Sequence, residues 1–143
     1  MEGRAIVVTS WACIAMFAVA TLPVAVGLDA FDGVAVVVSL VLFLASLPIW
    51  LYAYGLAITR TARGDNITVS RLFFLSGSAP TDVKRHLFGA LLASLVIAVA
   101  TAAANPPSVL VPMLPLGFAG LWGARHGTYP PRPATPKQTG GRR

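Results

Sequence analysis

Charged residues are scarce in this chain of 143 residues. Asp, Glu, Lys and Arg together make up 11% of it, whereas an ordinary soluble domain has about 25%. Hydrophobic residues make up 56%, which excludes intrinsic disorder for most of the chain because disorder requires low hydrophobicity. A disulfide scaffold is also excluded, because Cys13 is the single cysteine. The composition therefore predicts one small integral membrane domain.

Asp, Glu, Lys, Arg and His are absent from four long apolar stretches, at residues 5–28, 34–59, 87–104 and 109–124. The first two are long enough to span a bilayer, and the last two lie near the lower limit of about 17 residues. Because these runs are continuously apolar, they predict helices and not the alternating strands of a barrel. We therefore predict an all-α polytopic membrane protein with four transmembrane helices, arranged as two helical hairpins.

Further boundaries follow from composition. The transmembrane domain is predicted at residues 1–127 and includes a loop at residues 60–86. Residues 128–143 are rich in proline and arginine and are predicted to form a disordered tail.

Basic residues are missing from two of the three connections between the apolar stretches. The first connection carries Asp29 and Asp32 and no base, and the third, at residues 105–108, is uncharged. With four spans, every basic residue falls on one side, which the positive-inside rule assigns to the cytoplasm. We therefore predict a multi-pass membrane protein with both termini inside. A cleaved signal peptide is the competing interpretation of the first stretch, but at about 24 residues it exceeds the usual apolar core of about 7–15.

Small residues recur at helical spacing in the last two apolar stretches. Such spacing lets helix backbones approach closely. The predicted helix-packing residues are Gly89, Ala93, Gly117, Gly120 and Gly123. We expect them to bring the last two helices together as a tight hairpin.

Residues 67–75, within the long loop, are apolar enough to lie among lipid headgroups, with Arg71 extended toward phosphate. Near the end of the second stretch, Trp50, Tyr52 and Tyr54 fit an aromatic belt at the membrane interface.

The basic clusters are the best functional feature of the sequence. The residues expected to bind anionic lipid headgroups or an acidic protein partner are Arg60, Arg63, Arg71, Lys84, Arg85 and Arg125. The alternative is that these charges only set the topology. Nucleic acid is not expected, because no aromatic stacking platform accompanies the bases.

No set of residues indicates catalysis or a cofactor. His86 precedes the third apolar stretch and His126 follows the fourth, so both are predicted on the same side of the membrane. Two histidines, however, are too few ligands for a zinc site. We therefore expect no metal and no cofactor.

Two segments resemble a known family. They read Gly-Leu-Trp-Gly-Ala-Arg-His-Gly-Thr-Tyr-Pro-Pro-Arg at residues 120–132 and Arg-Leu-Phe-Phe-Leu-Ser-Gly-Ser-Ala-Pro at residues 71–80. Both are similar to stretches of small uncharacterised actinobacterial membrane proteins with four spans. The resemblance implies a plasma-membrane location and carries over no catalytic residue.

These observations favour a non-enzymatic role. We expect an accessory or assembly subunit of an envelope complex, with partner contact or self-association within the membrane. One alternative is a small oligomeric transporter or channel, whose substrate would be neutral or lipidic because the spans lack charge. Another is a lipid-modifying enzyme that uses the loop at residues 60–86.

Overall fold

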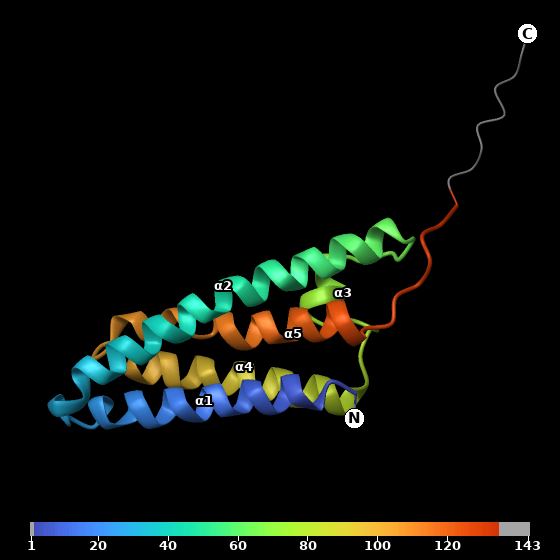
Figure 1. Ribbon diagram of the computed structural model, residues 1–143. Coiled ribbons are helices and arrows are strands. Elements are labelled where there is room, and N and C mark those ends of the chain that lie inside the picture. The colour runs from blue at the N-terminus through green and yellow to red at the C-terminus, as the bar shows by residue number, and fades with distance from the viewer. Residues whose placement is uncertain (1, 135–143) are drawn as a thin grey trace, which may run out of the picture.

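The computed structural model describes residues 2–134, which are all-helical apart from their connections and contain no strand (Figure 1). In chain order the elements, with η for a 3-10 helix, are α1 (Arg4–Ala25), η1 (Asp29–Phe31), α2 (Asp32–Ala62), α3 (Val69–Phe73), α4 (Thr81–Thr101), η2 (Pro106–Leu110) and α5 (Met113–His126).

Four segments of residues 2–134 are long and apolar enough to cross a membrane: Arg4–Ala25, Asp29–Ala62, Thr81–Thr101 and Pro106–His126. The predicted all-helical character and number of apolar helices are therefore confirmed. The longest helix is α2, whose 31 residues rise about 46 Å, well beyond a hydrocarbon core of about 30 Å. This length exceeds what a span perpendicular to the bilayer requires.

The helix ends differ from the apolar stretches in the sequence. The helix α4 begins at Thr81, six residues before the third apolar stretch, and includes the charged residues Asp82, Lys84 and Arg85. Hydropathy marks the part of a helix that suits lipid, whereas backbone hydrogen bonding sets where the helix begins. The fourth segment is interrupted, because η2 opens with Pro106 and Pro107 and α5 begins only at Met113. Each proline lacks the N–H that a continuous helix would need.

The helices pack so that segments far apart in sequence become neighbours. The helix α1 contacts α2 and α4, and α5 contacts α2, α4 and the short α3. Figure 1 shows α1 and α4 side by side, both running away from the end that holds the N-terminus. A buried cluster at the centre of the bundle includes Phe17, Leu42, Val111, Leu114 and Phe118.

Polar side chains tie the break between α4 and α5 to α2. The Asn105 side chain is 1% exposed. Its Nδ2 donates to Ser39 Oγ at 2.9 Å and to the Ala35 carbonyl at 3.3 Å. The Ser108 hydroxyl donates to the Ala98 carbonyl at 3.2 Å. These bonds give the buried side-chain donors of Asn105 and Ser108 the partners that burial requires.

Candidate functional site

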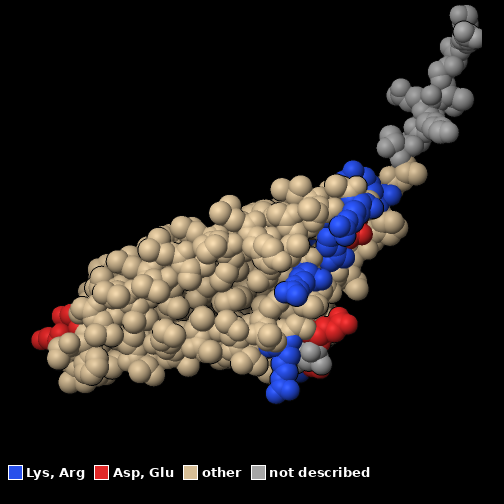
Figure 2. Space-filling model, in the orientation of Figure 1, with Lys and Arg blue, Asp and Glu red and all other residues tan. Residues whose placement is uncertain are grey.

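Basic side chains gather at one end of the bundle, which we call the basic end. Figure 2 shows Lys and Arg at this end, together with some acidic side chains, whereas the charged side chains visible at the opposite end, where Asp29 and Asp32 lie, are all acidic. Not all of these bases are free to bind a partner. Arg63, Arg85 and Arg125 are exposed, and Lys84 is half-buried.

Arg60 is held within the fold. Its Nε lies 2.8 Å from Asp65 Oδ2, and its Nη1 donates to the Ala124 carbonyl near the end of α5 at 3.1 Å. Its guanidinium also lies 4.8 Å from the centre of the Tyr129 ring, within cation–π range. Arg60 therefore joins α2, the loop and α5. This role differs from the lipid or partner contact predicted from the sequence.

The segment after α5 is also held in place. The Thr128 N–H donates to the Ser78 carbonyl, the Asn66 N–H to the Pro130 carbonyl and the Arg132 N–H to the Gly64 carbonyl, at 2.8–3.0 Å. The start of the expected disordered tail is thus held by backbone bonds to the connections between α2 and α3 and between α3 and α4. Residues 135–143 of that tail lie outside the described residues.

Tyr129 attaches the segment after α5 to α5 itself. Its hydroxyl donates to the Gly123 carbonyl at 2.8 Å. Burial raises the pKa of the Tyr129 phenol above its ordinary value of 10.0, while the positive charge of Arg60 acts in the opposite direction. The phenol is therefore kept neutral and able to donate.

The glycines of α5 make room for aromatic side chains. An added Cβ on Gly117 would lie 2.9 Å from the Trp50 ring, and one on Gly120 would overlap the Phe73 ring. The two rings stack with centroids 4.4 Å apart, and Trp50 Nε1 donates to the Met113 carbonyl at 2.9 Å. These glycines therefore face α2 and α3, whereas the sequence analysis expected them to face the preceding helix, α4.

Of the remaining predicted packing residues, Gly123 also faces α3, whereas Gly89 faces α1. An added Cβ on Gly123 would lie 2.5 Å from the Leu72 carbonyl of α3. An added Cβ on Gly89 would lie 3.3 Å from the Trp11 ring of α1. Ala93 is half-buried on α4.

The short helix α3 packs on the bundle. Leu72 and Phe73 are each 3% exposed, and α3 contacts α5. The predicted headgroup position therefore fits only the outer side of this segment, where Val69 and Phe74 are exposed. Arg71 is half-buried, and its Nη1 is buried without a hydrogen-bond partner in the described chain.

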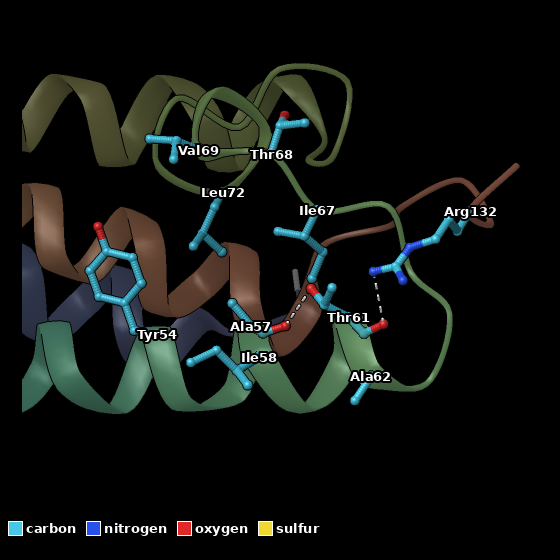
Figure 3. A pocket seen from close by; sticks show the side chains of 10 residues that line it. All are labelled: Tyr54, Ala57, Ile58, Thr61, Ala62, Ile67, Thr68, Val69, Leu72 and Arg132. Atoms are coloured by element: carbon cyan, nitrogen blue, oxygen red, sulfur yellow. Dashed lines mark hydrogen bonds between the residues drawn. The ribbon is translucent and has the colours of Figure 1, made fainter.

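An apolar groove lies between α2 and α3 at the basic end (Figure 3). Its volume is about 420 Å³. Figure 3 shows Ile58 and Leu72 on facing sides and Arg132 at the rim, where Nη2 donates to the Thr61 carbonyl at 3.4 Å. The groove thus combines an apolar wall with one cation, which suits an amphipathic ligand.

The two histidines do not form a metal site. His86 lines a cavity with Arg4 and Trp11, whereas His126 lines a different one with Glu2 and Asp82. Within residues 2–134, no group of three or more His, Cys, Asp and Glu side chains could hold a metal ion.

Sequence reasoning missed the contacts that Tyr129, Thr61 and Arg132 make at this end of the molecule. Tyr129 and Arg132 stand in a proline-rich segment that is typical of a solvated tail. An aromatic residue directly after an apolar helix was the only available signal for an anchoring contact.

The chain was compared with known proteins by family, by sequence and by structure, and no family model, curated protein or solved structure matches it.

Proposed function

We propose that this chain is a non-enzymatic accessory or assembly subunit of an envelope complex in an actinobacterial plasma membrane. In this proposal the basic end faces the cytoplasm, both termini lie inside, and α1–α2 and α4–α5 form two hairpins. Protein contacts within the membrane and anionic headgroups or an acidic partner at the basic end hold the subunit in place.

The exposed cations at one end carry the proposal. Arg63, Arg85 and Arg125 are exposed there, while Asp29 and Asp32 are exposed at the other end. Arg60 is engaged inside the fold, so its charge serves the architecture. Free cations beside an apolar bundle favour anionic partners, each contributing about 1 kcal/mol near an anionic leaflet.

The flanks of the bundle support contact within the membrane. Large apolar side chains cover the outer faces, including Leu51 on α2 and Val99 on α4, which are 73% and 78% exposed. By contrast, the glycines of α5 already face aromatic residues of this chain. A partner would therefore meet the outer faces of α2 and α4 and not the glycine stripe.

Affinity purification from native membranes tests the proposal. The tag belongs at the C-terminus, because the Glu2 carbonyl accepts a hydrogen bond from the buried Trp122. A stoichiometric partner that is retained in mild detergent, and lost when Arg63, Arg85 and Arg125 are replaced by Gln, would support an accessory subunit. A particle that contains only this chain would contradict it.

The alternative is a small oligomeric transporter or channel for a neutral or lipidic substrate. The interruption at η2 and the buried Asn105 favour it, because broken helices with polar backbone near them form substrate sites in transporters. Flux across liposomes that contain the purified chain alone would support this alternative over the accessory role.

A further inference from the structure

A second groove lies on the opposite side of the bundle, between α1 and α4. It encloses about 790 Å³ and is lined by Arg4, Val7, Val8, Trp11, Ala12, Ala15 and His86. This volume falls within the range of about 300–1,000 Å³ that is typical of ligand sites. We call it the α1–α4 groove.

Its length matches one leaflet of a bilayer. Along α1 it extends from Arg4 to Ala15, which is about 16 Å at 1.5 Å per residue, and half of a hydrocarbon core of about 30 Å is about 15 Å. Arg4 marks the end of the helix, so the groove runs inward from the edge of the apolar layer.

Its polarity changes along this length. Arg4 and His86 are exposed at the mouth. Beyond Arg4 the lining along α1 is apolar, with Val8, 54% exposed, one turn in and the Trp11 indole, 39% exposed, about two turns in, before Ala12 and Ala15. A groove that has a cation at its outer end and is otherwise apolar matches a phospholipid, whose phosphate lies at the membrane surface and whose acyl chain extends into the apolar layer.

Gly89 helps to shape this groove. An added Cβ there would lie 3.3 Å from the Trp11 ring, which is closer than ordinary van der Waals contact. The missing side chain lets the indole lie against α4. The ring thereby forms one wall of the groove beside His86.

We propose that the α1–α4 groove binds one anionic glycerophospholipid of the cytoplasmic leaflet. The phosphate lies between Arg4 and His86, and one acyl chain lies along Val8, Ala12 and Ala15. This proposal rests on the orientation given under Proposed function, with the basic end in the cytoplasm.

Native mass spectrometry of the full-length protein tests this site. The protein is purified in mild detergent and titrated with phosphatidylglycerol or with phosphatidylcholine. We expect one phosphatidylglycerol to bind more tightly than phosphatidylcholine. Arg4→Gln is expected to weaken phosphatidylglycerol binding about fivefold, the equivalent of about 1 kcal/mol per base, while Arg4→Lys retains it.

A steric variant separates the groove from the general charge of this end. Ala12→Phe fills the groove and leaves every charge in place, and we expect it to abolish the tightly bound lipid. Val37→Phe is the matched control, because Val37 is 59% exposed on α2 and lies outside this groove. We expect Val37→Phe to bind as the wild type does.

Three results would overturn the proposal. They are equal binding of the two lipids by the wild type, unchanged binding by Ala12→Phe, and a loss in Arg125→Gln as large as in Arg4→Gln. The last would show that binding follows total charge, because Arg125 does not line the groove. Copurification of a protein partner tests the accessory role separately, so either proposal can fail while the other stands.

Discussion

Gly120 shows how one missing side chain decides the packing at the basic end. The Phe73 ring occupies the space in which a Cβ would lie, and Phe73 stacks in turn on Trp50. One position on α5 therefore sets the distance between α5, α3 and α2.

We expect Gly120→Leu to lower the stability of the protein and its accumulation in membranes. The added side chain must displace Phe73, and overpacking of this kind costs about 1–3 kcal/mol or more. The measurement is the thermal midpoint of the detergent-solubilised protein.

Gly55→Leu is the matched control for this substitution. Gly55 also lies inside a helix, but nothing lies within 4 Å of its added Cβ. A wild-type midpoint in Gly120→Leu, or an equal drop in Gly55→Leu, would contradict the prediction. Phe73→Ala in the Gly120→Leu background should restore part of the loss, since contacting residues are not additive.

Tyr129 predicts a pH dependence at the high end of the scale. Its pKa is raised in the folded protein, so the folded state binds the phenolic proton more tightly than the unfolded state does. The stability that this group contributes is therefore fully present below pH 10 and is lost as the pH rises through the folded pKa. Tyr129→Phe should remove that loss. The comparison is made by thermal unfolding of both proteins between pH 8 and pH 11, and identical profiles would contradict it.

At the scale of the elements, hydrophobicity predicted which segments suit a lipid environment, but it predicted few of the contacts between them. The four apolar helices could be predicted because each needs an uninterrupted apolar surface. Hydropathy alone does not predict the start of α4 at Thr81, because its first turns are charged; the local signal for a helix start there is Asp82 in the first turn, which favours the helix dipole.

The candidate site was predictable only as a region. The side of the molecule that bears the bases followed from charge alone. Charge does not distinguish Arg60, which is bonded within the fold, from Arg63, which is exposed. That difference depends on where Asp65 and Tyr129 lie in space. The neighbours of Gly117 and Gly120 likewise come from α2 and α3, and sequence spacing cannot name them.

The junction of α4 and η2 predicts an energetic coupling between helices. Asn105 Nδ2 donates to Ser39 Oγ on α2, where both side chains are buried. Asn105→Ala and Ser39→Ala should each destabilise the protein, and a double-mutant cycle should give a coupling of about 0.6–1.7 kcal/mol, as for hydrogen bonds between membrane helices. Strict additivity in reversible unfolding would show that the bond contributes nothing.

For the whole molecule, the placement of charge predicts its orientation in the membrane. Ala30 in η1 and Ser76 in the long loop are both exposed, at opposite ends of the bundle. In a Cys13→Ser background, we expect an impermeant maleimide to label Ala30→Cys in intact spheroplasts and Ser76→Cys only after lysis. The reverse pattern would place the basic end outside and contradict the positive-inside assignment.

The pairing of α1 with α4 has a consequence for how the chain is made. About 40 residues separate the end of α2 from the end of α4. Their translation takes about 2–8 s at 5–20 residues per second. During that interval the ribosome has delivered α1 while its neighbour α4 is still being synthesised. A chain truncated before residue 101 should therefore persist as an incomplete bundle with its inner faces open, which makes it a substrate for membrane proteases and for the insertion machinery.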